Sequence, residues 1–233
     1  MTERLTSPEP RRETCALLLI DFQRDFCKAG GYADRFDGGV GWAVPALAAA
    51  KRLLSAARDA ALLIVHTREG YAADLSDCTL QRRIRSREAG AEIGSAGPLG
   101  RLLIRGEPGH DFVASVAPRP GEVVIDKASY GAFVAPQLET LLRHRAIEHL
   151  FFSGVTADVC VHTTLREATD RGYFCHYVRD AIATFDPVLQ AACERMVQVE
   201  GGIWGRLVES DRVIADWGEF SADHGSGRNQ HRG

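Results

Sequence analysis

The stretch HLFFSGVTADVCVHTTLREATDRGY, residues 149–173, decides the fold because a strand, a turn and a helix follow one another in it. The apolar run at 149–154 predicts a strand buried on both faces. The segment 157–171 has helical periodicity, begins after the capping residue Thr156 and ends at Gly172, a typical helix stop. A buried strand that leads directly into a helix is the repeating unit of an α/β sheet.

Further segments of the same two kinds alternate along the chain. Strand-length apolar runs occur at 15–21, 61–67, 122–127 and 174–180, with a weaker one at 212–215. Helix-period segments occupy 44–60, 136–145 and 187–200. Near-continuous apolar strands separated by helices are typical of a parallel sheet with right-handed crossovers. The sequence therefore predicts an α/β fold: a three-layer α/β/α arrangement around a doubly wound, mostly parallel sheet.

One domain, residues 14–217, accounts for most of the chain. The stretch 68–121 separates two predicted strands without strong periodicity, which is typical of a functional lid or binding loop. The polar ends, 1–13 and 218–233, are predicted to be disordered tails.

Composition excludes several classes of protein. The 233 residues are 45% hydrophobic and 25% charged, with a net charge of −3, which are ordinary globular values. No apolar run approaches the roughly 18–20 residues that cross a bilayer, and the N-terminus has no apolar signal region. The six cysteines form no C-x-x-C pair, which favours free thiols in a reducing compartment. We therefore expect a cytoplasmic protein whose partner is a small-molecule substrate, with no nucleic-acid or membrane partner.

Three reactive side chains follow three of the predicted strands. Asp21 ends the first, Lys127 ends the third, and the turn after the fourth leads to Cys160. Because the carboxyl ends of parallel strands meet at one edge of the sheet, these residues are expected to converge there. An ammonium and a helix N-terminus both favour a thiolate, and a carboxylate can take the thiol proton. The pattern predicts a cysteine nucleophile with Asp21 as base.

The residues that carry this triad also carry a family resemblance. LLLIDFQRDFC (17–27), VIDKASYGAF (124–133) and SGVTADVCVHTTLREATDRGY (153–173) resemble the isochorismatase-like cysteine hydrolases. The resemblance implies an Asp21–Lys127–Cys160 triad, a cis peptide between Val155 and Thr156, and an oxyanion hole formed by the Thr156 and Cys160 amides. It also implies a homo-oligomer, a dimer or a tetramer.

The resemblance extends to one group within that family, the biuret and triuret hydrolases. The segments that carry it are HTREGYAADLSDC (66–78), GPLGRLLIRGEPGHDF (97–112) and VEGGIWG (199–205). It implies a cysteine-dependent amidohydrolase that cleaves a C–N bond of a small urea-type amide and releases ammonia through an acyl-thioester. Two alternatives stay open: a ureidoacrylate- or N-carbamoyl-type amidohydrolase of the same family, and a catalytically silent member that binds a ligand.

Five residues are candidate substrate contacts. Phe26 and Phe133 lie near the triad segments and could sandwich a planar urea, while Arg68 and Glu69 leave a strand at the start of the lid. Glu200 stands where that group has a glutamine for the far end of the substrate. An ionised glutamate only accepts hydrogen bonds, so it favours an –NH2 terminus or a cation.

No cofactor is expected, and no metal. The metal-binding nicotinamidases of the family carry an Asp-x-His pair and a further histidine after the second strand, whereas His66 stands alone in this chain.

Overall fold

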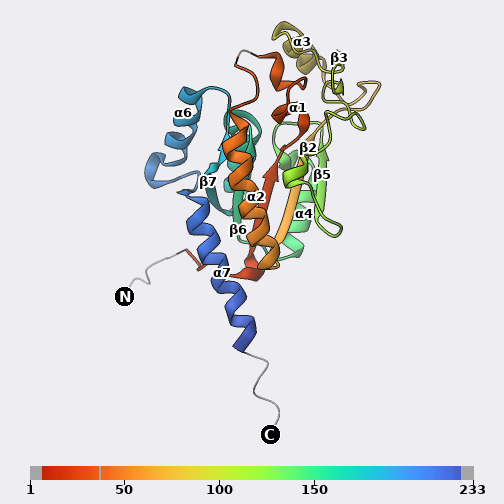
Figure 1. The fold of residues 1–233 in the computed structure, drawn as a ribbon. Helices are drawn as coiled ribbons and strands as arrows, with labels where there is room; N and C mark the ends of the chain where they lie inside the picture. Colours follow the sequence, from red (N-terminus) through yellow and green to blue (C-terminus); the bar gives the residue numbers. More distant parts are fainter. Residues whose placement is uncertain (1–6, 37, 227–233) are drawn as a thin grey trace.

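The computed structural model describes residues 7–36 and 38–226, with side chains as far as residue 220. Within these residues six strands form one parallel sheet in the order β5-β2-β1-β6-β7-β8 (Figure 1). The strands are β1 (Cys15–Ile20), β2 (Leu63–Glu69), β5 (Val123–Lys127), β6 (His149–Val155), β7 (Phe174–Ala183) and β8 (Arg206–Val208). The predicted α/β class with a parallel sheet is confirmed.

Helices cover both faces of this sheet (Figure 1). The helices are α1 (Arg24–Cys27), α2 (Ala43–Asp59), α3 (Leu80–Glu88), α4 (Pro136–His144), α5 (His162–Asp170), α6 (Pro187–Val197) and α7 (Ser210–Ser226). Because side chains of a strand alternate between its faces, Leu17 and Leu19 pack with α2 and α7, whereas Leu18 and Ile20 pack with α4 and α5. The central strand β1 is thus buried on both sides, as its unbroken apolar sequence predicts.

The prediction of a strand at 212–215 is wrong, because these residues lie inside α7. Val213 and Trp217 are buried and stand four residues apart, so they share one face of a helix that packs on α2. The last strand of the sheet is instead β8, which pairs with β7 through Tyr177 and Leu207.

The lid contains more regular structure than the sequence indicates. It starts after Glu69, where β2 ends, and it includes α3 and a short antiparallel pair, β3 (Ala96–Gly97) and β4 (Gly100–Arg101). Figure 1 shows α3 and β3 beyond the same end of the sheet as α1. The lid therefore stands over the carboxyl ends of β1 and β2.

The two predicted tails extend beyond the described residues, at 1–6 and 227–233. Residues 12–14 form a single 3₁₀ turn, and residues 218–226, predicted to be disordered, continue α7. The buried Trp217 anchors this helix just before that point.

Two further predictions can be compared with the described residues. All six cysteines are free and buried in the structure. None of the helices in the described part of the chain has the length and apolar character that crossing a membrane requires.

Candidate active site

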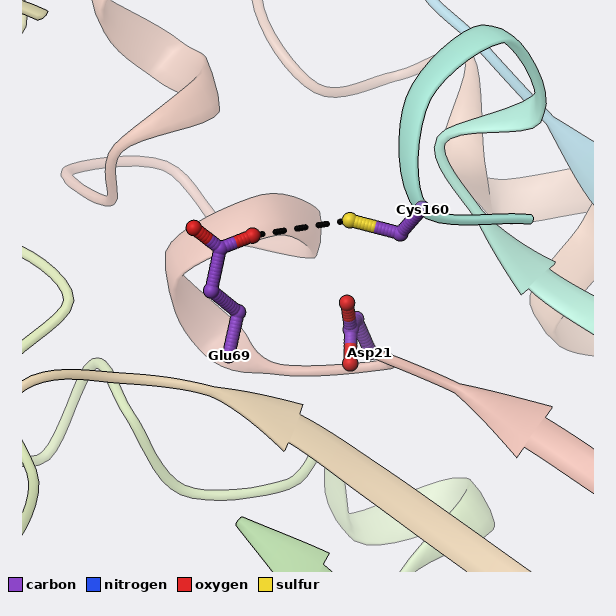
Figure 2. A group of neighbouring side chains, drawn as sticks. All are labelled: Asp21, Glu69 and Cys160. Atoms are coloured by element: carbon purple, nitrogen blue, oxygen red, sulfur yellow. Dashed lines mark hydrogen bonds between the residues drawn. The ribbon is translucent and has the colours of Figure 1, made fainter. Parts of the chain in front are cut away.

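The three predicted triad residues lie together at the carboxyl edge of the sheet. Lys127 Nζ donates a hydrogen bond of 2.6 Å to Asp21 Oδ2, and both side chains are fully buried. A carboxylate oxygen of Asp21, one of Glu69 and the Cys160 sulfur all lie within 4.8 Å of one another (Figure 2). The expected convergence is present, while the catalytic roles of these residues stay predictions.

The backbone at Asp21 turns sharply out of β1. Its φ is 52°, a left-handed conformation that aspartate tolerates better than most residues. Thr67 of the neighbouring strand donates its hydroxyl to Asp21 Oδ1 at 2.6 Å, so both carboxylate oxygens have a partner. The carboxylate is therefore held in one orientation beneath the sulfur.

Lys127 uses its ammonium group as a fixed charge. Besides the bond to Asp21, Nζ donates to the carbonyl oxygens of Ser129 at 2.8 Å and Tyr130 at 2.9 Å. Burial alone lowers the pKa of Lys127, but the nearby anionic groups, Asp21 first, raise it overall. The residue is a permanent cation at the centre of the site.

Cys160 lies in a turn that connects β6 to α5. Residues Ala157–Val161 form a π-helical turn, and the amides of Val159 and Val161 donate to the carbonyl oxygen of Thr156. The peptide between Val155 and Thr156 is cis, as the resemblance implied. The end of β6 lies very close to β1: a Cβ atom at Gly154 would be only 2.4 Å from the carbonyl oxygen of Ile20. Only glycine permits this approach of the two strand ends.

Glu69 is the fourth polar group of the site. Glu69 on β2 and Lys127 on β5 stand opposite each other in the register of these two strands. Glu69 Oε2 lies 3.5 Å from the Cys160 sulfur, whose thiol donates a hydrogen bond to it (Figure 2). Its other oxygen accepts a 2.8 Å hydrogen bond from the Tyr71 hydroxyl and lies 3.7 Å from Arg82. Glu69 thus contacts the Cys160 sulfur directly, while its role as a substrate contact stays a prediction.

The electrostatics of the site differ from the sequence expectation. Burial raises the pKa of the Cys160 thiol well above its ordinary value; Lys127 lowers that pKa, but Asp21 and Glu69 raise it. Burial also raises the pKa of Glu69. Desolvation and two carboxylates thus raise the thiol pKa more than the one ammonium lowers it. The sulfur keeps its proton until a base removes it.

A cavity of about 420 Å³ opens beside the sulfur. Cys160, Thr156, Glu69 and Phe26 all line it, so four of the predicted site residues face one space. The rest of the wall is mostly apolar and comes from the loops after α1, β5 and β7, the lid and the turn after β6: Tyr32, Ala33, Phe36, Arg85, Ala89, Ile93, Leu103, Tyr130, Asp158, Val159 and Phe185.

Arg68 does not line this cavity. It precedes Glu69 on β2, so the alternation of the strand sends it to the opposite face. There its guanidinium pairs with Asp126 at 2.7 Å and lies over the ring of Phe112. The structure thus gives Arg68 a structural ion pair in place of the predicted substrate contact.

Phe133 and Glu200 also lie away from the cavity. The ring of Phe133 is buried in the core against the ring of Tyr173, with centroids 5.9 Å apart. Phe133 belongs to a short 3₁₀ turn that starts at Ala132 and packs against α5. Glu200 is exposed in a turn after α6, with φ of 51°. Neither side chain reaches the space beside Cys160 within this chain.

Sequence reasoning missed several residues of the cavity wall. Tyr32 and Arg85 belong to no motif, whereas Tyr130 and Asp158 each lie inside one without a predicted role. The position of Arg85 in the lid was the only available signal, since lids commonly carry binding residues.

Asp21, Glu69 and Cys160 are chemically able to ligate a metal ion. However, Lys127 already places a positive charge 2.6 Å from Asp21. The charge that a cation would supply is thus built into the chain, and the expectation of no metal stays a prediction.

Comparison with known proteins places the chain in a family. The model of the isochorismatase domain matches residues 15–203, so the chain belongs to the isochorismatase family. It is 30% identical to the ureidoacrylate amidohydrolase RutB of Variovorax paradoxus over 185 residues, which cover 75% of this chain and 71% of that protein.

Solved structures show the same fold. A cysteine hydrolase from Pseudomonas syringae pv. phaseolicola superposes with a TM-score of 0.77 at 22% identity, covering 94% of this chain and all of that one. N-carbamoylsarcosine amidase from Thermoplasma acidophilum superposes with a TM-score of 0.63 at 22% identity, covering 85% of this chain and 97% of that one.

Proposed function

We propose that this protein is a cysteine-dependent amidohydrolase that cleaves a C–N bond in the terminal carbamoyl group of a small ureido compound. One observation carries the proposal: Asp21, paired with Lys127 at 2.6 Å, and Glu69 both adjoin the Cys160 sulfur, which faces a cavity of about 420 Å³. A nucleophile, a base and a fixed cation in contact are the groups that covalent hydrolysis of an amide requires.

The reaction begins with a protonated thiol. Asp21 takes the proton from Cys160 as the sulfur attacks the carbamoyl carbon, and the Thr156 and Cys160 amides stabilise the oxyanion. The proton passes to the departing nitrogen, ammonia leaves, and a thioester joins the sulfur to the rest of the substrate. Water, activated by Asp21, then hydrolyses the thioester to a carbamate and restores the thiol. An oxyanion donor of this kind contributes about 10²–10³-fold in rate.

Lys127 and Glu69 have supporting parts in this scheme. The ammonium keeps the Asp21 carboxylate oriented and offsets the negative charge that develops at the sulfur. Glu69 Oε2, next to the sulfur, is a hydrogen-bond acceptor for the N–H groups of the carbamoyl end.

Similar proteins favour one kind of ureido compound. The curated relative is described as acting on ureidoacrylate, and the structural neighbour on N-carbamoylsarcosine. Both compounds carry a terminal carbamoyl group. The narrower expectation of biuret or triuret came from the segments 66–78, 97–112 and 199–205, and Glu200 of the last segment lies in a turn away from the cavity. We therefore favour the ureidoacrylate- or N-carbamoyl-type activity.

Ammonia release from a small panel tests the proposal. The panel contains ureidoacrylate, N-carbamoylsarcosine, biuret, triuret and a simple aliphatic amide, each with the wild-type protein and with Cys160→Ala. We expect turnover of a ureido acid by the wild type and loss of at least 10³-fold in the variant.

Four other results of this panel would change the proposal. Turnover of the aliphatic amide alone would reject the ureido class, and turnover of biuret or triuret alone would restore the narrower expectation. An active Cys160→Ala protein would reject the cysteine mechanism. A folded wild type that releases ammonia from none of the five compounds would favour a silent, ligand-binding member.

A further inference from the structure

The outer part of the cavity contains one cation that the proposed chemistry does not use. Arg85 belongs to the lid helix α3, is exposed, and lines the cavity. Its guanidinium donates a hydrogen bond to the hydroxyl of Tyr130. Among the described residues, no carboxylate lies within 4.0 Å of it, so Arg85 is a cation without an anionic partner.

Its neighbour on the helix is differently placed. Arg82 lies 3.7 Å from Glu69, donates to the Tyr71 hydroxyl at 3.1 Å, and stacks its guanidinium 3.8 Å from the centre of the Tyr130 ring. Arg82 is thus committed to the protein, and its contacts hold the first turn of α3 and Tyr130 in place. Arg85 is one turn further along, on the same side of α3 and beside the same tyrosine.

Two hydroxyl groups accompany this free guanidinium. One belongs to Tyr130, whose backbone carbonyl also accepts from the catalytic Lys127. The other belongs to Tyr32, on the loop after α1; burial raises its pKa to about 12, while Arg85 acts in the opposite direction from close by. Tyr32, Tyr130 and Arg85 all line the cavity. An arginine fork flanked by hydroxyl donors matches the planar oxygens of a carboxylate.

The cavity therefore has two ends of opposite character. Around the buried sulfur lie acceptors: Glu69, and Asp158, whose Oδ1 accepts from Thr184. Towards the solvent lies the unpaired cation of the lid. The remaining wall is mostly apolar and aromatic and includes the rings of Phe36 and Phe185, stacked with centroids 6.4 Å apart. A ligand with N–H donors at one end and an anion at the other fits this order.

We propose that Arg85, with the hydroxyls of Tyr32 and Tyr130, binds the carboxylate of a ureido acid whose carbamoyl group lies at Cys160. The inference rests on the proposed function and makes Arg85 the residue that selects a carboxylated substrate over an uncharged one. A neutral compound such as biuret leaves the guanidinium without an anion. The lid helix then recognises the far end of the substrate, and the sheet edge acts on the near end.

A pair of substrates that differ only in charge tests the inference. We would measure kcat/KM for 3-ureidopropionate and for its methyl ester with the wild type, Arg85→Met, Arg85→Lys and Tyr130→Phe. Arg85→Met should lower the preference for the acid over the ester by about 10- to 100-fold, the usual loss when a charged hydrogen-bonded partner is removed. Arg85→Lys, which keeps the charge but not the fork, should retain part of that preference.

Arg87→Met is the matched control, because Arg87 lies on the same helix, is exposed, and pairs with Glu92. It should keep the wild-type preference. If Arg85→Met leaves the acid-to-ester ratio of kcat/KM unchanged, the inference is overturned. If both kcat/KM values then fall equally, Arg85 has a structural role only. If the wild type releases ammonia from none of the ureido compounds, including these two, the proposed function fails instead. Direct binding of the acid, measured by calorimetry with the wild type and Arg85→Met, then decides the carboxylate site separately.

Discussion

At the scale of single residues, the position of Cys160 explains why the site needs a base. The side chain is 3% exposed and has the buried carboxylates of Asp21 and Glu69 as neighbours. An anionic sulfur in that place would have lost its water and would face two other negative charges. Burial and these two carboxylates therefore favour the neutral thiol.

This protonation state predicts slow alkylation at neutral pH. Because burial raises the thiol pKa, the rate at which iodoacetamide labels Cys160 should rise about tenfold per pH unit from pH 7 to pH 9, without a plateau in that range. Mass spectrometry of the peptide that contains residue 160 would measure the rate, with the Cys160→Ala protein as the blank. A rate already at its plateau at pH 7 would show a stabilised thiolate and contradict the assignment.

Strand alternation decides which predicted contacts reach the site. Arg68 and Glu69 are adjacent at the end of β2, and both were reasonable candidates from their position. Successive side chains point to opposite faces, so only one of them can face Cys160, and the pairing of Glu69 with Lys127 determines which. Sequence position alone locates the strand end but not the direction of each side chain.

At the scale of elements, the apolar runs were sufficient to predict five of the six strands. The run at 212–215 misled because four apolar-rich residues fit a short strand and a helix turn equally well. The helix became visible only through Trp217, which packs against Phe151 of β6 with ring centroids 5.0 Å apart. Similarly, the short β8 has too few residues for a periodic signal.

The sequence identified the lid as an insertion between two strands, but it did not show how the lid is attached to α1 and to the loop after it. Asp25 of α1 is fully buried, and its carboxylate accepts hydrogen bonds from the amides of Leu103 at 2.9 Å and Tyr32 at 3.2 Å. It thereby ties the lid to the loop that forms the aromatic wall. Contacts between residues about eighty positions apart leave no local pattern in the sequence.

Asp25→Asn should loosen this attachment. The amide group of asparagine presents a donor to one of the two backbone amides, which leaves a buried N–H without an acceptor at a cost of about 1–3 kcal/mol. We expect a lower melting temperature and faster hydrogen exchange at the Leu103 amide. Asp34→Asn is the control, since Asp34 accepts from Gly30 in the same loop and, within the described part of the chain, makes no hydrogen bond to the lid. Unchanged exchange at Leu103 would show that the lid is held by other contacts.

At the scale of the whole molecule, burial of histidine links stability to pH. Burial lowers the pKa of five histidines, at both ends of the sheet and under its helices: His66, His110, His149, His162 and His176. The unfolded chain takes up protons at these positions near pH 6.5, whereas the folded chain does not. Stability should consequently be fully present above pH 6.5 and fall as the pH decreases towards 4.

The pair His149 and His176 offers the sharpest test of this linkage. Their ring nitrogens lie 3.1 Å apart, His176 stacks on Phe151 with centroids 4.3 Å apart, and burial lowers the pKa of His176 from 6.5 to about 4. A pKa difference of that size corresponds to at most roughly 3 kcal/mol, lost as the pH falls from 6.5 to 4.

His176→Gln keeps a hydrogen-bonding side chain beside His149 but cannot bind a proton. Urea unfolding between pH 7.5 and 4.5 should therefore show a shallower loss of the free energy of unfolding, by up to about 1.4 kcal/mol per pH unit near pH 5.5. His144→Gln, at the exposed end of α4, controls for the loss of a histidine as such. If the free energy of unfolding falls with pH at the same slope in the wild type and in His176→Gln, this buried pair does not set the acid stability of the fold.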